Sequence, residues 1–468
     1  MRKTKIVCTI GPSSANLNTL KQMILAGMNV ARFNMSHGTH ESHHESIELV
    51  KRARDELGVP VAIMIDTKGP EIRVGKFQDG VAKIKKGDKF VLTTRNVVGN
   101  EQGVSVSLPT FNNIVKQGDK ILINDGLIKL EVEAISGSDV LCKILVGGEI
   151  TNHKSINIPG VDLDADYLSE VDKKDILFGI KEEADIFSIS FVSCVEDVLD
   201  VRKFLKKHKY EDKCLICSKI ESRKSVENMD DIISVSDAIM VARGDLGVEV
   251  EFEKIPYIQK KLISKCLAQG KPIITATEML ESMINNIRPT RAEISDIANA
   301  VLDGTSALML SGETSAGKYP VLSVETMSKI AEECERTINY DKIHDFSYSN
   351  NVSASIGYAA CELSKTLQAK AIIVATNSGF ASRCVSRFRP TCQIIACTPH
   401  YNVYNQMSLN WGVIPIMDKV YTDTDSLLQS SKLMAHHHRL VKRGDVVVQT
   451  AATTAGGNGS NLLLVDIV

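Results

Sequence analysis

The sequence has few aromatic residues and almost no excess of charge of either sign. Of its 468 residues only 5% are aromatic, one of them a tryptophan, and 55 lysines and arginines nearly balance 57 aspartates and glutamates. A chain without a basic excess lacks the electrostatic footprint that attracts nucleic acid or an anionic membrane. We therefore expect neither as a partner, whereas a small ligand held by local charges is compatible with this composition.

Long apolar runs are missing as well. No run approaches the roughly 18 apolar residues that cross a membrane. The basic start is followed only by Ile6–Ile10 before a Gly-Pro pair, which is too short for a signal peptide. The 11 cysteines are odd in number and scattered, which suits reduced thiols better than a disulfide framework. We expect a cytoplasmic protein.

Apolar runs of strand length alternate with helix-like segments over the first two-thirds of the chain. Such runs are typical of parallel strands buried on both faces, and eight of them favour a closed (β/α)8 TIM barrel. The expected strands are Lys5–Ile10, Asn29–Phe33, Val61–Ile65, Ile186–Ser190, Leu215–Lys219, Ala238–Val241, Pro272–Thr275 and Ala307–Leu310. The expected helices include His40–Leu57, Val195–Lys207 and Arg291–Leu302.

Two stretches interrupt this rhythm and predict two further domains. In 70–162 the pattern alternates as in exposed β-strands, for example Lys89–Thr93 and Ile121–Glu133 with its Asn124-Asp125-Gly126 turn signal, which indicates a small β-barrel lid inserted after the third strand. In 339–468 the α/β alternation restarts and predicts an open, parallel sheet. Its expected strands are Ala371–Ala375, Gln393–Cys397 and Val446–Thr450. The barrel then comprises 1–69 and 163–338.

Polar residues follow six of the expected barrel strands. They are Arg32, Asn34, Ser36 and His37; Asp66, Thr67 and Lys68; Lys219 and Glu221; Arg243, Gly244 and Asp245; Thr275 and Thr277; and Ser311 and Glu313. Because the carboxyl ends of barrel strands converge on one mouth, where such barrels place their chemistry, we expect these residues to form one site. The less favoured explanation is that these polar residues only mark the places where six strands end in loops.

The residue types at this rim suit phosphoryl transfer. Glu221 and Asp245 supply hard oxygen ligands for Mg²⁺, and the turn that starts at Gly244 offers free N–H groups to an anion. Arg32 and Lys219 can spread positive charge over a moving phosphoryl group. We expect Lys219 and Glu221 to leave opposite faces of their strand, so that a bend at the strand end is needed for both to reach the mouth.

Three motifs outside this set are assigned structural roles. Gly312–Lys318 matches seven positions of a phosphate-binding loop, but Tyr319 replaces the hydroxyl residue that would hold Mg²⁺. Cys214 and Cys217 have redox spacing within a strand run and are expected to be buried thiols. The run 436–438 consists of three histidines that leave a helix in different directions and is expected to be solvated.

A loop in the third domain is a candidate phosphate site. Thr376, Asn377, Ser378, Gly379 and Ser382 lie between an expected strand and helix, where hydroxyl and N–H groups can cradle a phosphate. An ordinary strand-to-helix turn is the alternative. The segment Ala451–Ser460 is a candidate for another part of the same pocket.

The sequence resembles the pyruvate kinase family over essentially its full length. The matching segments are Lys5–Pro12, Ala31–Gly38, Asp66–Arg73, Lys219–Glu221, Met240–Glu249, Arg288–Glu293 and Met309–Thr314. The resemblance implies transfer of phosphate from phosphoenolpyruvate to ADP, giving pyruvate and ATP in the last step of glycolysis. It also implies a homotetramer whose third domain joins subunits and receives a phosphorylated allosteric effector.

The resemblance also assigns roles to individual residues. Lys219, Arg32 and Thr277 would be catalytic, and with Gly244 and Asp245 they would bind the substrate. Glu221 and Asp245 would bind Mg²⁺ or Mn²⁺. Potassium would be held by Asn34, Ser36, Asp66 and Thr67, and Glu71 is the acidic residue that accompanies a potassium requirement. The nucleotide would contact Asn34, His37, Arg73 and Lys154.

The sequence departs from the family pattern at five positions. Met35 stands where phenylalanine is usual, Glu278 replaces a usual glutamine, and His153 replaces a frequent lysine. Ser193 and Cys194 stand where a basic residue is common. The positive charges missing at His153 and at Ser193–Cys194 would affect nucleotide affinity more than the type of reaction. Two alternatives stay open: a Mg²⁺-dependent barrel lyase or aldolase acting on a pyruvate enolate, and a non-catalytic metabolite-binding regulator.

Overall fold

A computed structural model describes residues 2–124, 126–161, 167–338, 351–453 and 459–468. Eight parallel strands form a closed barrel, in the order β1-β17-β16-β15-β14-β13-β3-β2. They are β1 (Lys5–Thr9), β2 (Val30–Asn34), β3 (Ala62–Asp66), β13 (Ile186–Ile189), β14 (Leu215–Ile220), β15 (Ala238–Ala242), β16 (Ile273–Ala276) and β17 (Ala307–Leu310). The predicted TIM barrel is confirmed, and every strand lies within two residues of its expected bounds.

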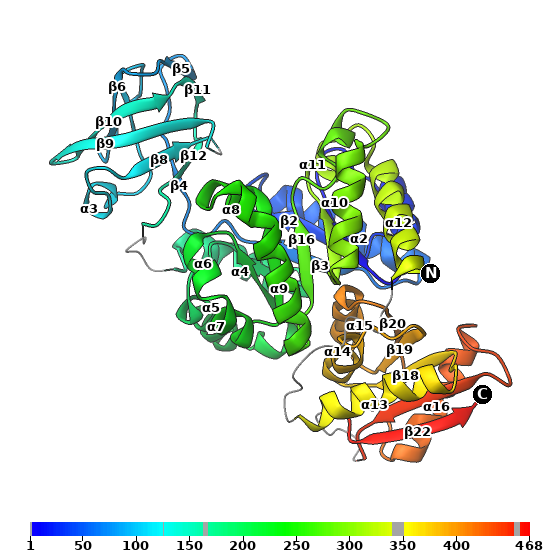
Figure 1. Cartoon of the computed structure of the whole chain (residues 1–468). Helices are drawn as coiled ribbons and strands as arrows, with labels where there is room; N and C mark the ends of the chain where they lie inside the picture. The colour runs from blue at the N-terminus through cyan, green and yellow to red at the C-terminus, as the bar shows by residue number, and fades with distance from the viewer. Residues whose placement is uncertain (1, 125, 162–166, 339–350, 454–458) are drawn as a thin grey trace.

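Helices surround the barrel and bury one face each against it (Figure 1). They are α1 (Leu17–Ala26), α2 (His40–Leu57), α4 (Glu170–Lys181), α5 (Val195–Lys207), α6 (Arg223–Glu227), α7 (Met229–Val235), α8 (Arg243–Glu249), α9 (Ile255–Gln269), α10 (Arg291–Leu302), α11 (Gly312–Ser315) and α12 (Pro320–Thr337). The bounds of α2 and α10 are encoded locally. Thr39 and Thr290 each form a capping box at the start, and Gly58 ends α2 in the left-handed conformation.

The strands between β3 and α4 form a separate β unit. A seven-stranded sheet has the order β4-β12-β8-β9-β10-β6-β7, and β5 pairs with β11. The strands are β4 (Ile72–Arg73), β5 (Val81–Ile84), β6 (Lys89–Thr93), β7 (Gly103–Ser105), β8 (Lys120–Ile123), β9 (Ile128–Ser136), β10 (Asp139–Val146), β11 (Gly148–Thr151) and β12 (Ser155–Asn157), with the short helix α3 (Phe111–Ile114) between β7 and β8. Asn124 and Gly126 have positive φ at the expected turn, whereas Asp125 lies outside the described residues.

The last part of the chain forms a five-stranded sheet in the order β20-β19-β18-β21-β22. Its strands are β18 (Ala371–Ala375), β19 (Gln393–Thr398), β20 (Val413–Met417), β21 (Val446–Ala451) and β22 (Leu462–Ile467), with helices α13 (Val352–Thr366), α14 (Phe380–Ser386), α15 (Tyr401–Gln406) and α16 (Thr424–His437). The three expected strands β18, β19 and β21 pair in parallel, as predicted, whereas the edge strand β22, which was not expected, runs antiparallel to β21. The stretch between them is too short for the helical crossover that a parallel pair requires.

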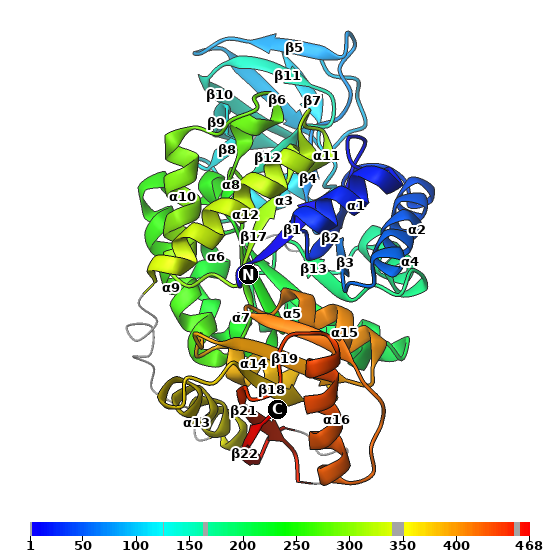
Figure 2. The ribbon, with the colours of Figure 1, turned by 90° about the vertical axis from the view of Figure 1, so that its right-hand side faces the viewer.

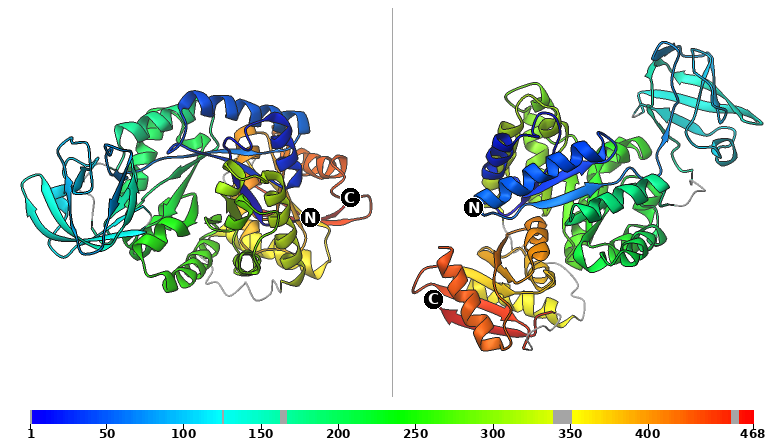
Figure 3. Two further views of the ribbon diagram at one scale, coloured as in Figure 1. Left: turned by 90° about the horizontal axis from the view of Figure 1, so that it is seen from above. Right: turned by 180° about the vertical axis from the view of Figure 1, so that it is seen from behind.

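The three units are arranged in a row, with the β unit at one end of the barrel and the last sheet at the other (Figure 2). A view from behind shows the same order (Figure 3). The expected boundaries at 162/163 and 338/339 involve residues outside the described ranges, so they stay predictions.

Three assignments made from motifs are confirmed. Cys214 and Cys217 are buried free thiols whose pKa is raised by burial. The three histidines at 436–438 are exposed at the end of α16. Gly312–Lys318 forms the four-residue helix α11 and the turn before α12, in place of a phosphate-binding loop. Among the described residues no helix is long and apolar enough to span a membrane.

A buried lysine joins the base of the barrel to the last domain. Lys5 Nζ donates a hydrogen bond to the Val413 carbonyl at 2.7 Å, and close by Arg389 Nη2 donates to the Gly304 carbonyl at 2.8 Å. Burial lowers the pKa of Lys5 to about 7, and Arg2 adds to the decrease while Glu335 opposes it. The junction therefore includes a buried amine that is easily deprotonated.

We expect Lys5→Met to remove part of the pH dependence of stability. Between about pH 7 and about pH 10 the unfolded chain binds a proton at Lys5 that the folded chain does not, so stability rises with pH in this window. Relative to the variant, the parent should gain roughly 1 kcal/mol per pH unit. Urea unfolding followed by the fluorescence of Trp411 measures this difference. Lys329→Met, at a side chain that is 75% exposed, is the control and should show no such trend.

Candidate active site

Four charged side chains meet at the carboxyl ends of β2, β3 and β14. Arg32 Nε lies 2.5 Å from Asp66 Oδ2, and Lys219 Nζ lies 2.7 Å from Glu221 Oε1 and 3.5 Å from Asp66 Oδ1. The expectation that Lys219 and Glu221 leave opposite faces of their strand is wrong. Residues two apart lie on the same face of a strand, so both reach the mouth without a bend.

Asp66 stands between the two cations and is completely buried. Burial alone would raise the pKa of its carboxyl, but Arg32 and Lys219 together hold that pKa below its usual value. For Lys219, burial would lower the pKa, while Asp66 and Glu221 raise it above the usual value. The aspartate is thus an anion and the lysine an ammonium, fixed at the rim by their mutual attraction.

Glu221 is the second buried carboxylate, and its two oxygens differ. Oε2 accepts a hydrogen bond from the Phe191 N–H at 2.6 Å, at a residue held in left-handed backbone with φ of 55°. Oε1 is paired with the Lys219 ammonium, 2.7 Å away. Burial raises the pKa of Glu221 to about 7; Lys219 opposes this rise and Asp245 adds to it. Two neighbouring carboxylates, Glu221 and Asp245, offer the hard oxygen ligands that a divalent cation takes.

The turn after β16 is strained and tied to the start of α8. Thr277 and Glu278 have φ of 69° and 53°, a conformation that β-branched residues rarely adopt. Thr277 Oγ1 accepts a hydrogen bond from the Gly244 N–H at 2.8 Å, so the expected substrate-binding turn and Thr277 are in contact. Arg243 Nη2 donates to the Thr277 carbonyl at 2.5 Å and Arg243 Nη1 pairs with Asp296, which holds this turn in place.

A cavity of about 520 Å³ lies beside this rim, between the β unit and the barrel. From the β unit it is lined by Pro70–Ile72 and Ser155–Ile158, and from the barrel by Phe191, Asp245 and Glu249 among others. The cavity thus places Asp245, one of the candidate metal ligands, opposite residues of the inserted unit. A ligand with one reacting end at the rim and the rest under the β unit would fit this arrangement.

The expected potassium ligands come from the ends of two neighbouring strands. Asn34 pairs with Asp66 in the register of β2 and β3, and Thr67 follows Asp66. Asn34 Oδ1 accepts a hydrogen bond from the Ser36 N–H at 3.1 Å. Asp66 and Thr67 are buried, whereas Asn34 and Ser36 are half-buried. The structure therefore brings the four residues to one part of the rim.

The expected nucleotide contacts are spread over two units: Asn34 and His37 belong to the barrel, and Arg73 and Lys154 to the β unit. Arg73 Nη2 pairs with Glu71 Oε2 at 2.7 Å, and Arg73 Nη1 donates to the His153 carbonyl at 2.8 Å. Lys154 is half-buried beside them, and its carbonyl accepts a hydrogen bond from the Val74 N–H. His37 is exposed after β2, on the barrel.

The five departures from the family pattern have identifiable surroundings. Met35 is buried in the barrel core, Glu278 is exposed beside Thr277, and His153 has a φ of 58° at an exposed turn. The N–H groups of Ser193 and Cys194 both donate to Asp197 Oδ2, which caps the start of α5. Ser193 and Cys194 are thus part of a helix cap.

Two residues that sequence reasoning missed fix the cations of the rim. Ser190, at the end of the fourth barrel strand, accepts a hydrogen bond from Lys219 Nζ at 2.8 Å and donates to the Thr67 carbonyl. Thr9, at the end of the first, accepts from Arg32 Nη1 at 2.8 Å. Both are hydroxyl residues at the carboxyl end of a barrel strand. That position alone could have identified them as residues of the site.

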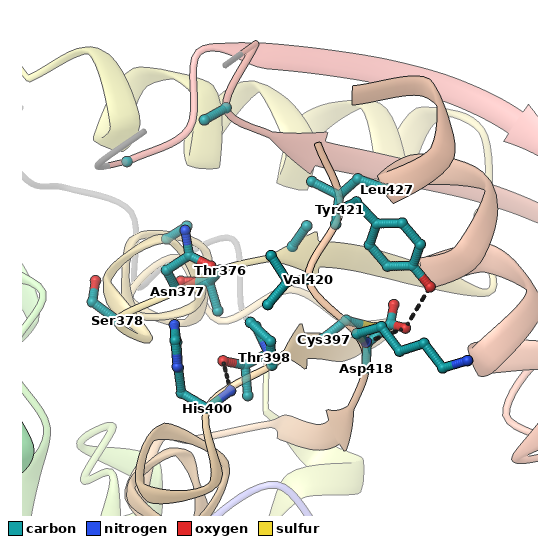
Figure 4. A pocket seen from close by; sticks show the side chains of 16 residues that line it. Thr376, Asn377, Ser378, Cys397, Thr398, His400, Asp418, Val420, Tyr421 and Leu427 are labelled. Atoms are coloured by element: carbon teal, nitrogen blue, oxygen red, sulfur yellow. Dashed lines mark hydrogen bonds between the residues drawn. The ribbon is translucent and has the colours of Figure 1, made fainter. Parts of the chain in front are cut away.

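A second cavity, of about 270 Å³, lies in the last domain (Figure 4). Thr376, Asn377 and Ser378 line it, as do residues such as His400 and Tyr421. Ser382 does not line it: its side chain is completely buried and its hydroxyl donates to the Gly379 carbonyl at 2.7 Å, so its role as an effector contact stays a prediction. Of Ala451–Ser460, Ala452 and Gly459 line the cavity, and 454–458 lie outside the described residues.

Comparisons with known proteins agree over nearly the whole chain. Residues 1–324 match the pyruvate kinase barrel domain and residues 354–465 match the pyruvate kinase alpha/beta domain. The pyruvate kinase of Clostridium acetobutylicum is 47% identical over 435 residues, 92% of each chain, and that of Clostridium perfringens is 42% identical over 441 residues, 93% of each. The crystal structure of a pyruvate kinase from Cryptosporidium parvum superimposes with a TM-score of 0.93 at 37% identity, covering 100% of this chain and 96% of that one. The chain therefore belongs to the pyruvate kinase family and is a phosphotransferase.

Proposed function

We propose that the barrel rim carries out the pyruvate kinase reaction, with Lys219 as the group that stabilises the transferred phosphoryl group. The observation that carries this assignment is the position of Lys219. Its ammonium is buried at the rim, between Asp66 and Glu221 and hydrogen-bonded to Ser190. A preorganised cation that is shielded from water stabilises charge developing on a transferring phosphoryl group without having to reorganise.

The other rim residues divide the binding of phosphoenolpyruvate among them. Arg32, fixed by Asp66 and Thr9, grips the phosphate. The backbone of Gly244 and Asp245 receives the substrate carboxylate, for which the Gly244 N–H exchanges its hydrogen bond to Thr277. Thr277 then lies on the face of the enolate where protonation gives pyruvate. The strained backbone at Thr277 supports a functional role, because such conformations cluster at active sites.

Glu221 and Asp245 would hold Mg²⁺ or Mn²⁺, which when bound supplies charge neutralisation between substrate phosphate and carboxylate. The burial of Glu221 close to Asp245 supports this assignment, because two carboxylates that are held together gain from a shared cation. Arg73 and Lys154 of the β unit, with Asn34 and His37 of the barrel, would bind the phosphates of ADP and ATP. The cavity between the two units is lined by the sequence neighbours Ile72 and Ser155 of Arg73 and Lys154, which supports a nucleotide lying close to it.

We expect activity to require K⁺, held by Asn34, Ser36, Asp66 and Thr67, and Glu71→Lys to relieve the requirement. A lysine at this position would place an ammonium where the ion's charge is needed. The measurement is pyruvate formation from phosphoenolpyruvate and ADP with Mg²⁺, in K⁺, in Na⁺ and in a bulky organic cation. The parent should lose at least ~10-fold without K⁺ and the variant less than about threefold, since one binding charge is being replaced.

Each outcome of this assay has a distinct meaning. Activity in all three salts would keep the kinase and contradict the potassium cage. Activity in none, with folded protein, would favour a lyase acting on a pyruvate enolate or a non-catalytic regulator. The cavity beneath the β unit counts against the lyase, because enolate chemistry needs no second substrate there. The complete rim counts against the regulator.

Three further proposals concern the regulation, the oligomeric state and the cellular location of the enzyme. The cavity at Thr376–Ser378 would take the phosphate of an allosteric effector. A homotetramer is supported by large exposed apolar side chains on two units, such as Phe252 and Tyr257 on the barrel and Leu433 and Ile467 on the last domain. A cytoplasmic location agrees with eleven cysteines that are free thiols.

A further inference from the structure

Helices α2 and α4 lie side by side on the outside of the barrel, away from the rim (Figure 2). Between them, one side chain of α4 and two of α2 form a cluster of metal-ligating groups. His44 Nδ1 lies 3.0 Å from both oxygens of Glu182, and the ligand atoms of His44, Glu48 and Glu182 all lie within 4.8 Å of one another. None of the three takes part in the proposed reaction.

We propose that His44, Glu48 and Glu182 bind a divalent transition-metal ion, in the first place Zn²⁺. Ligand atoms around tetrahedral Zn²⁺ stand about 3.3 Å apart, given bonds of about 2.0–2.1 Å. His44 and Glu182 are already at this separation, so that Glu48 makes the main movement. Its side chain is 53% exposed and free to change rotamer.

The ligand set is partly fixed in advance by the fold. His44 and Glu48 are four residues apart on α2 and therefore lie on the same face of the helix. Glu182 comes from the end of α4, and its side chain is only 3% exposed. One imidazole and two carboxylates leave a fourth position for water on the solvent side, where His44 is half exposed. Imidazole favours Zn²⁺ over Mg²⁺, which prefers an all-oxygen octahedron.

Lys51 partly neutralises the two carboxylates of the cluster, as a bound metal ion would. Its Nζ lies 2.9 Å from Glu48 Oε1 and 4.0 Å from Glu182 Oε2. Two carboxylates and one ammonium leave a net negative charge when His44 is neutral. A metal ion must therefore displace Lys51 or bind against its charge. This competition gives the proposal a consequence that a purely structural ion-pair cluster would not have.

A bound ion would cross-link two segments that flank the inserted β unit in sequence. Helix α2 precedes β3 and α4 is the first described helix after β12. The cross-link would stabilise the outer layer of the barrel without touching the rim. Turnover should therefore be the same in His44→Ala as in the parent, so loss of this site and loss of the phosphotransferase reaction are separable.

Calorimetric titration of the full chain with Zn²⁺ tests the proposal. Excess Mg²⁺ occupies the oxygen ligands of the rim, and prior alkylation blocks the accessible thiols. His44→Ala and Glu48→Gln should each weaken one Zn²⁺ site at least ~10-fold, as loss of a ligand does. Lys51→Met should strengthen it roughly 30-fold, the effect of removing a unit positive charge about 4 Å from a doubly charged ion in water-like surroundings.

His437→Ala is the matched control, because it removes a histidine from the exposed run on α16 and should leave the affinity unchanged. Unchanged affinity in His44→Ala, or weaker binding in Lys51→Met, would overturn the proposal. Loss of binding in His437→Ala alone would move the ion to α16 and would also overturn it. Thermal unfolding adds a second measurement: Zn²⁺ should raise the midpoint of the parent and not that of His44→Ala.

Discussion

Lys219→Met should lower turnover by at least ~10²-fold while the Michaelis constant for phosphoenolpyruvate changes little. Methionine has nearly the same length as lysine and lacks its charge, so the variant removes the ammonium that faces the rim and keeps most of the packing. Arg32 still grips the substrate phosphate, because its contacts to Asp66 and Thr9 do not involve Lys219. The loss should therefore fall on the chemical step.

Steady-state kinetics and binding of phosphoenolpyruvate measured without ADP separate the two effects. Lys329→Met is the control, since this lysine is 75% exposed on α12 and no role in binding or catalysis is proposed for it; its turnover should stay within about twofold, as for a charge remote from the reacting atoms. The substitution leaves Asp66 and Glu221 without one cation, so the fold of the variant has to be verified by circular dichroism. A folded Lys219→Met enzyme with normal turnover would exclude Lys219 from the mechanism.

Glu221→Gln should weaken divalent-metal binding at least ~10²-fold and reduce turnover to a similar extent. Glutamine has the same shape, and its amide oxygen can still accept the Phe191 N–H hydrogen bond. What is lost is the negative charge of the buried carboxylate, which the proposed Mg²⁺ would need. Binding of Mn²⁺, followed by electron paramagnetic resonance, reports this loss independently of catalysis.

Glu249→Gln is the control for this prediction. Glu249 is a half-buried carboxylate that lines the same cavity as Asp245, and it is not among the proposed metal ligands. Its substitution should leave the affinity for Mn²⁺ within about threefold, the range expected for a carboxylate outside the coordination sphere. Equal losses in the two variants would mean that general negative charge attracts the ion, and the assignment of Glu221 as a ligand would then fail.

Local sequence signals account for the parts of the fold that were predicted well. The barrel strands are continuous apolar runs, and α2 and α10 carry their own caps, so each could be identified without knowledge of its neighbours. The edge strand β22 gave no comparable signal. It was not among the expected strands, and its antiparallel direction follows from the short connection from β21.

The sequence predicted which residues form the candidate site much better than it predicted which residues those side chains contact. Arg32, Asp66, Lys219 and Glu221 were found because each follows a barrel strand. That Ser190 holds Lys219 and Thr9 holds Arg32 depends on which strands are neighbours and on side-chain length. The contact of Ser382 was equally unforeseen: its place in the loop suggested a ligand contact, whereas in the structure its buried hydroxyl donates to the Gly379 carbonyl.

The closure of the barrel affects how the protein folds while the ribosome synthesises it. Strand β1 pairs with β17, with Lys5 opposite Ala307, so the first strand made must wait for one of the last before the barrel can close. At translation rates of about 5–20 residues per second the wait is roughly 15–60 s. During that time the inserted β unit, whose core draws only on its own residues, can fold completely. The nascent barrel edges meanwhile stay open to pairing with other chains, and a chaperone that shields them would act before residue 307 emerges.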